Sequence, residues 1–505
     1  MKKFYTLCIA LIVFIFSGCS EKEATTKKEE KKEKVVTISQ GSKPKSLDPG
    51  MYNEIPSLSI VDQIFNTLFV IDENGNIQPE LVETYEYVSP TELIITLKKG
   101  VKFHNGDELK ANDVVFSLNR MIEKPATKVM LDVISSVDKK DDYTVQINLK
   151  ESSAPLLYTL SYPLTSILNE KDTLAKEGNI SISPVGTGPF VFKEWGDGEK
   201  IELIANENYF DGRPVIDSLI FRSIVENSSR LAALETGEID IASIAPIDVE
   251  LVENSKDLYA VSYPTTSTEY LTLNTQKAPF NNVDFRKAVN AAIDKQSIVD
   301  AVYLGKASVA KSIVNPTVFG SNQNVKMDGY DPEKAKEYLA KSGIENPKFK
   351  IMSNDNPIRL QAAQIIQANL KEVGIDVEIE TVEWGTYLQL TAQGQFDVFI
   401  GGWVSGTSDA DIVLFPLLHS SFHGGAGNRA LYVNSEYDKL VETGRTSINP
   451  QDRLNAYNKA QEILAEDMPL IPLYYKNDNM GLSKKIKNFK AVPNTIHSYN
   501  KIDKE

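Results

Sequence analysis

The segment from residue 348 to residue 401 alternates between strand and helix patterns, and this alternation constrains the fold more than any other feature. Lys348–Ser353 is typical of a strand. Apolar residues then recur at spacings of three and four, which predicts a helix that Gly374 ends. The strand 375–379, a short helix around 386–392 and the apolar strand 396–401 follow. This order predicts an α/β fold with a parallel sheet and helices on its faces.

The carboxyl end of the last of these strands is Gly401-Gly402-Trp403. Ligands of open parallel sheets bind beyond the carboxyl ends of the strands. We therefore expect a binding site at these three residues.

The amino-terminal part of the chain predicts a smaller mixed region. Val35–Ser39 is expected to be the first strand, and 92–98 and 143–149 alternate apolar and polar residues as strands do. Between the last two, Asp113 is predicted to cap a helix. No repeat and no low-complexity segment follows Lys34, so we expect one continuous globular structure with more than one core in this chain of 505 residues.

The first residues predict export. Met1–Lys3 is basic, Leu7–Phe16 is an apolar run of ten residues, too short to span a bilayer, and Ser17-Gly18-Cys19 supplies small residues for cleavage. We interpret 1–18 as a signal peptide. The triplet before Cys19 resembles the lipobox of bacterial lipoproteins, with Phe16 where Leu is usual, which implies that Cys19 carries a lipid. A plain signal peptide followed by a chance cysteine is the alternative.

The mature chain is expected to be tethered and free of disulfides. Residues 19–34 lack large apolar side chains after the cysteine and are interpreted as a disordered tether. The chain has two cysteines, Cys8 in the predicted signal and Cys19, so the body has no thiol. A net charge of −15 makes the protein a poor partner for nucleic acid and for anionic lipid headgroups.

Searches for catalytic and metal-binding motifs give no positive result. The chain has no Gly-x-Ser-x-Gly and no His-Glu-x-x-His motif. His419 and His423 are four residues apart, but a surface loop is favoured over a metal site in a chain with 4 histidines. The spacing of Asp409 and Asp411 does not provide opposed carboxylates for glycoside hydrolysis. We expect no enzyme activity, no cofactor and no resident metal.

Several motifs together resemble a known family, the extracellular solute-binding proteins (family 5) of peptide/nickel-type ABC importers. These motifs are Val101–Asp107 with Lys110–Leu118, Pro184–Phe190, Tyr330–Ala335 and Met468–Leu473. They fall in the order that the family has, and the resemblance covers essentially the whole mature chain.

The resemblance implies a periplasmic-binding-protein-like clamshell of class C, type II, with two domains and an extra lobe. Domain I would comprise 35–55, 187–262 and 478–505, the extra lobe 56–186, and domain II 263–477. It also implies a monomeric lipoprotein outside the cell that captures short peptides and delivers them to a membrane permease driven by an ATPase. A same-fold binder of another solute, such as chelated nickel or an oligosaccharide, and a secreted hydrolase are the alternatives.

The ligand-binding residues follow from the same resemblance. In the dipeptide branch an Asp that pairs with the ligand amine occupies the place of Gly406, whereas the window 402–411 resembles the glutathione and peptide branch. Asp409 is therefore predicted to hold the ligand amine. Asp411 is a second candidate, although capping of the helix 412–418 is the favoured role for it.

A cationic partner for the ligand carboxylate is predicted in Arg359, which follows a strand and lies near a helix start. A solvent-facing arginine is the equally weighted alternative. The indole ring of Trp403 is predicted to lie on a ligand side chain or to pack between the lobes. The remaining predicted ligand-binding residues are Gly402, Thr407, Tyr52, Asn53, Asn494 and His497.

Overall fold

The computed structural model describes residues 33–72, 76–196, 200–424 and 427–505, with no side-chain description for 125, 126 and 129. Lys34–Glu505 forms one compact unit. The predicted signal peptide 1–18, the predicted lipidation site Cys19 and nearly all of the tether 19–34 lie outside the described residues. Within the described ranges, no helix has the length and apolar content that a membrane crossing requires.

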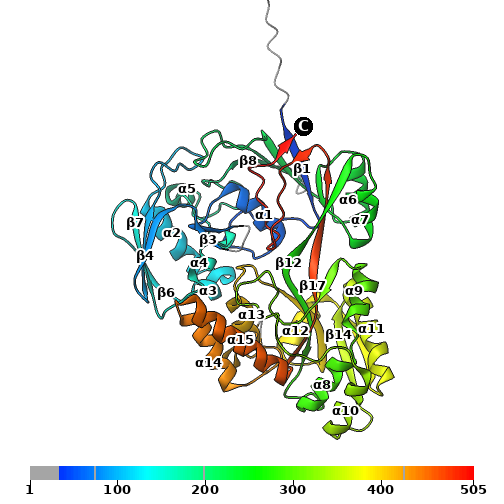
Figure 1. Cartoon of the computed structure of the whole chain (residues 1–505). Coiled ribbons are helices and arrows are strands. Elements are labelled where there is room, and N and C mark those ends of the chain that lie inside the picture. The colour runs from blue at the N-terminus through cyan, green and yellow to red at the C-terminus, as the bar shows by residue number, and fades with distance from the viewer. Residues whose placement is uncertain (1–32, 73–75, 197–199, 425–426) are drawn as a thin grey trace, which may run out of the picture. The chain divides into compact units, whose positions relative to one another are not determined.

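One large mixed sheet runs through this unit, and two long strands, β12 and β17, connect its halves (Figure 1). The strand order is β15-β14-β16-β12-β17-β11-β1-β10-β9-β8, with β13 paired to β17. The strands of this sheet are β1 (Val35–Gln40), β8 (Phe190–Gly196), β9 (Lys200–Ala205), β10 (Ser218–Ser223), β11 (Ile241–Ser243), β12 (Leu258–Leu273), β13 (Ala307–Val309), β14 (Lys348–Asn354), β15 (Asp376–Val382), β16 (Val398–Val404) and β17 (Leu470–Ser483).

The half of the sheet around β14 confirms the predicted strand–helix alternation. β14 pairs in parallel with β15 and with β16, while β16 pairs antiparallel with β12. Gly374, with φ of +87°, follows the helix that it was predicted to end. The helices of this half are α8 (Val283–Ala292), α9 (Lys295–Tyr303), α10 (Pro332–Ser342), α11 (Pro357–Glu372), α12 (Trp384–Ala392), α13 (Asp411–Leu418), α14 (Ser435–Thr446) and α15 (Pro450–Asp467).

The half of the sheet around β1 is built from segments far apart in the sequence. β1 pairs in parallel with β10 and with β11, and β10 continues antiparallel to β9. Its helices α6 (Asn227–Glu235) and α7 (Val249–Glu253) bury Leu234, Val249 and Val252 in a small core with Ile239 and Ile244. A two-stranded pair near the carboxyl end, β18 (Ile486–Lys487) with β19 (Asp503–Lys504), adds to this region.

Residues 55–175 contain a separate antiparallel sheet of order β4-β5-β7-β6. Alternate residues of β5 and β7 are buried, as the sequence pattern predicted. The elements are α1 (Ile55–Ile64), β2 (Phe69–Ile71), β3 (Ile77–Pro79), β4 (Val82–Ser89), β5 (Glu92–Leu97), α2 (Ala111–Ile122), α3 (Pro125–Leu131), β6 (Ile134–Lys139), β7 (Thr144–Leu149), α4 (Leu156–Thr159) and α5 (Glu170–Ala175).

The predicted cap of α2 is corrected. Lys110, not Asp113, occupies the N-cap position, and Asp113 lies one turn inside the helix. The Asp113 carboxylate accepts a hydrogen bond from the backbone N–H of Lys110 at 2.9 Å. It accepts another, also at 2.9 Å, from the backbone N–H of Glu170, the first residue of α5. The side chain therefore joins two helix starts.

The predicted domain boundaries stay a prediction. β12 and β17 pair along both halves of the large sheet, with a shift of register between Pro264 and Thr268. This irregularity lies next to residue 262, the point where the first domain was predicted to end.

Candidate functional site

Near the carboxyl end of β16, a side chain from the neighbouring strand lies close against the backbone at a glycine. Gly402 lies opposite Glu269 of β12 in the strand pair. A Cβ atom at Gly402 would lie 2.0 Å from Oε1 of Glu269, far inside van der Waals contact. The glycine thus lets the Glu269 carboxylate lie across the strand.

The Glu269 carboxylate forms an ion pair with Arg359. Nε of Arg359 donates to Oε2 of Glu269 at 3.0 Å, and Nη2 donates to Oε1 at 3.4 Å. Nη1 donates to Oδ1 of Asn354 at 3.3 Å. A guanidinium has five N–H groups, so these three bonds to described residues leave two N–H groups for a ligand acceptor.

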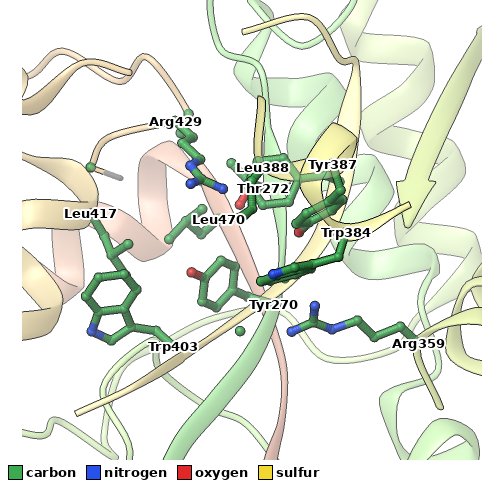
Figure 2. Close-up of a pocket in the computed structure, with 15 residues that line it drawn as sticks. Tyr270, Thr272, Arg359, Trp384, Tyr387, Leu388, Trp403, Leu417, Arg429 and Leu470 are labelled. Carbon is green, nitrogen blue, oxygen red and sulfur yellow. The ribbon is translucent and has the colours of Figure 1, made fainter. Parts of the chain in front are cut away.

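Arg359 lines a narrow pocket of about 200 Å³ whose walls include several aromatic rings. Figure 2 shows the guanidinium groups of Arg359 and Arg429 reaching toward its middle from different sides, with the Tyr270 ring between them. Trp384 and Tyr387 stack with ring centroids 5.4 Å apart and form another wall. Nη1 of Arg429 donates to the Thr391 hydroxyl at 2.7 Å, which helps to fix that side chain.

A wider cavity of about 760 Å³ adjoins this pocket and shares Gly402, Trp403 and Gly427 with it. The cavity lies between the start of α1, the segment around Tyr162, and the end of β16 with α13. Its lining is mostly apolar and includes Ile55, Met130, Tyr162, Trp403, Val404, Ile412, Pro416 and Phe422. A volume of this size is typical of small-molecule sites.

Gly406 lies against the ring of Tyr162. A Cβ atom at Gly406 would lie 3.0 Å from ring atoms and from the hydroxyl oxygen of Tyr162. Burial raises the pKa of Tyr162 above its ordinary value, so its phenol stays protonated and donates to Oδ1 of Asn53 at 2.9 Å. A side chain at position 406, such as the acidic one that the resemblance to the dipeptide branch predicts there, would therefore meet the Tyr162 ring.

The prediction that Asp409 receives a ligand amine is corrected. Asp409 is fully buried and does not line either cavity. Nη2 of Arg453 donates to its two carboxylate oxygens at 2.9 and 2.7 Å, and the backbone N–H of Asp411 donates to Oδ1 at 2.9 Å. Arg453 is itself 4% exposed. The pair joins the loop before α13 to α15, and its charges compensate each other inside the protein.

Asp411 is buried in the first turn of α13, where Ala410 holds the N-cap position, so the predicted capping role is not the one observed. Burial raises the pKa of Asp411 to about 6, against the lowering effect of Arg445. The closest approach to Arg445 is 3.6 Å, between Nη2 and Oδ2. Oδ1 of Asp411 has no hydrogen-bond partner among the described residues.

The other predicted site residues separate into two groups. Gly402, Trp403, Thr407 and Asn53 line the wide cavity, and Arg359 lines the narrow pocket. Tyr52, Asn494 and His497 do not line either one. His497 is buried, and its Nε2 lies 2.9 Å from the Tyr263 hydroxyl. The first group keeps its predicted role as candidate ligand contacts.

Several residues that line the wide cavity carry no recognisable signal in the sequence. Tyr162 and Met130 come from the region 55–175, and Ile412 and Phe422 from the segment after β16, so their meeting depends on long-range packing. Glu269 could have been singled out, because it is an acidic residue in a strand, β12, that pairs with β16. A carboxylate that becomes buried in a sheet requires a partner.

A cavity of about 760 Å³ beside two long strands that connect both halves of the large sheet is suited to a protein that binds a small solute. The family model of bacterial extracellular solute-binding proteins, family 5 (Middle), matches residues 76–425. The chain belongs to this family, its predicted α/β fold is confirmed, and the family consists of solute-binding proteins rather than enzymes.

Named relatives cover nearly the full length. The chain is 31% identical to heme-binding protein A of Haemophilus influenzae over 98% of this chain and 97% of that protein. It is 30% identical to the probable di/tripeptide-binding protein 5 of Pseudomonas aeruginosa over 91% and 93% of the two chains. The periplasmic binding protein DppA of Helicobacter pylori in complex with the peptide STSA matches with a TM-score of 0.80 at 30% identity, over 93% and 98%.

Proposed function

We propose that this protein captures short peptides outside the cell and delivers them to the membrane permease of an ABC importer. Glutathione belongs to the same ligand class. In this proposal the chain is a monomer, exported by the segment 1–18 and held at the cell membrane by a lipid on Cys19. If the cell has an outer membrane, the protein works in the periplasm.

The observation that carries the proposal is the pair of adjoining cavities at the end of β16, which share three lining residues. The wide cavity of about 760 Å³ has room for side chains, and the narrow pocket presents N–H groups of Arg359. A fixed guanidinium is suited to a peptide carboxylate. Relatives named as di/tripeptide-binding proteins support the same ligand class.

Capture requires that the ligand touch both sides of the cavity, because a ligand stabilises the closed form only through contacts absent from the open form. Asn53 and Tyr162 come from the amino-terminal part of the chain, and Trp403 and Thr407 come from the end of β16 and the loop after it. Micromolar affinity corresponds to about 8 kcal/mol, which is within reach of one charge-assisted contact plus apolar burial.

Isothermal titration calorimetry with di- to pentapeptides, glutathione, nickel–histidine and haemin tests the proposal. We expect binding of peptides, returned intact, and at least a tenfold loss for Ile412→Trp, which fills the wide cavity. The matched control is Ile247→Trp, since Ile247 is 72% exposed and lies outside the cavity. A response to haemin or to the nickel complex alone would overturn the peptide assignment.

A further inference from the structure

Two guanidinium groups face the narrow pocket, whereas the proposed peptide carboxylate uses the N–H groups of one of them. Arg359 and Arg429 both line the pocket, and none of the described residues in its lining is acidic. An apolar ligand end placed there would displace water from both guanidinium groups without offering an acceptor to either, which is unfavourable. The charge in the pocket therefore favours an anionic ligand end.

The Tyr270 hydroxyl is a second, independent indication of a polar ligand group in this pocket. Tyr270 lines the pocket and is 5% exposed, and its hydroxyl has no hydrogen-bond partner among the described residues. The fully enclosed polar atoms that lack a partner include Nε1 of Trp403 but not this hydroxyl, so the hydroxyl keeps accessible surface. Burial raises the pKa of Tyr270 above its ordinary value, so the phenol stays protonated and can donate. A ligand acceptor would remove the cost of leaving this donor unpaired.

The two guanidinium groups lie on different sides of the Tyr270 ring. In Figure 2 the ring stands between Arg359 and Arg429, and its hydroxyl points away from Arg359. Both guanidinium charges nevertheless lower the pKa of Tyr270 against the effect of burial, so both are near the phenol. The acceptor that suits this hydroxyl is therefore a group other than the carboxylate held at Arg359.

The pocket has room for such a second group. A cavity of about 150 Å³ accommodates a benzene molecule. The narrow pocket has about 200 Å³ and adjoins the wide cavity, where the rest of a peptide would lie. It can hold the end of one side chain.

We propose that the narrow pocket is a subsite for an acidic side chain at the carboxyl end of the peptide. Arg359 receives the terminal carboxylate. The side-chain carboxylate accepts from the Tyr270 hydroxyl and pairs with Arg429, and both contacts are strengthened by charge. The preferred ligands are thus short peptides that end in glutamate or aspartate. This inference rests on the proposed peptide-binding function and specifies its ligand class.

Calorimetry at pH 7 and physiological ionic strength with Ala-Glu, Ala-Gln and Ala-Leu tests the inference. Glutamate and glutamine have nearly the same shape, so this pair isolates the charge. We expect Ala-Glu to bind at least tenfold more tightly than either of the others. Equal or weaker binding of Ala-Glu would overturn the inference and leave the proposed function standing, whereas no binding of any peptide would overturn both.

Two variants assign the preference to the residues named. Arg429→Gln should reduce the preference for Ala-Glu over Ala-Gln to less than about twofold, with little change for Ala-Leu, since it removes the charge that distinguishes them. Tyr270→Phe keeps the ring and removes the hydroxyl, so Ala-Glu should bind about fivefold more weakly, as expected for one hydrogen bond, while Ala-Leu is unaffected. The matched control is Arg222→Gln. Arg222 lies on β10, pairs with Glu238 and does not line either cavity, so the preference should be unchanged.

The ratio of affinities separates a ligand contact from a structural effect. Arg429 also bonds the Thr391 hydroxyl, so a variant that only loosens this wall would weaken all three ligands together and keep their ratio. A retained preference in a folded Arg429→Gln variant, verified by circular dichroism, would overturn the inference. Equal losses for Ala-Glu and Ala-Leu in Tyr270→Phe would contradict the role given to the hydroxyl.

Discussion

Replacing Asp409 by Asn should weaken folding far more than ligand binding. The substitution keeps the shape of the side chain but leaves Arg453, which is 4% exposed, as a buried charge without its counter-ion. Removal of one partner of such a pair costs about 3–5 kcal/mol. An unfolding entropy of about 2 cal/mol/K per residue gives the unit Lys34–Glu505 about 1 kcal/mol/K, so Tm should fall by about 3–5 °C.

Thermal unfolding followed by circular dichroism at neutral pH measures this change. The control is Glu333→Gln. This substitution removes a surface ion pair in which Nζ of Lys336 lies 2.7 Å from Oε1 of Glu333, whose side chain is 81% exposed. Because exposed ion pairs contribute little to stability, Tm should change very little. The double variant Asp409→Asn with Arg453→Gln should recover part of the loss, since no uncompensated charge remains. An unchanged Tm together with a tenfold loss of peptide affinity would show that Asp409 serves the ligand and that the reasoning is wrong.

Three further predictions follow from single contacts. Arg120→Lys loses the two-pronged bond to Asp48, made at 2.8 and 2.5 Å, and should cost about 1–3 kcal/mol in urea unfolding; no loss would contradict the role of the pair. Gly402→Ala should abolish peptide binding in calorimetry by displacing the Glu269 carboxylate, and unaltered affinity would exclude that crowding. Burial lowers the pKa of His497 to about 4. The unfolded chain then binds a proton that the folded chain does not, so the unfolding free energy falls as pH drops from 6.5 to about 4, and His497→Gln should flatten this slope in denaturant titrations.

The sequence predicted the half of the sheet around β14 well because its signals are local. The apolar spacing of three and four in 360–373 and the glycine at 374 can be recognised from neighbouring residues alone. The observed bounds of α11 and of β14–β16 agree closely with the helix and strands predicted there. The end of β16 was predicted as part of the site for the same reason.

The interior electrostatics could not be predicted in the same way. Nothing in the sequence around Asp409 indicates an internal ion pair, because its partner Arg453 lies 44 residues later, on helix α15. Tyr162 contacts Gly406 through packing of two distant regions. A carboxylate that binds a ligand and one that binds an internal arginine have the same sequence pattern, and only the fold distinguishes them.

The proposed site is tested most directly by a crystal structure of the protein with a peptide that calorimetry has shown to bind. We expect peptide density between Tyr162 and Trp403, with the carboxylate directed to Arg359. Density at another place, such as the groove of about 660 Å³ beside Phe116 and Leu174, with the cavity at the end of β16 empty, would contradict the account.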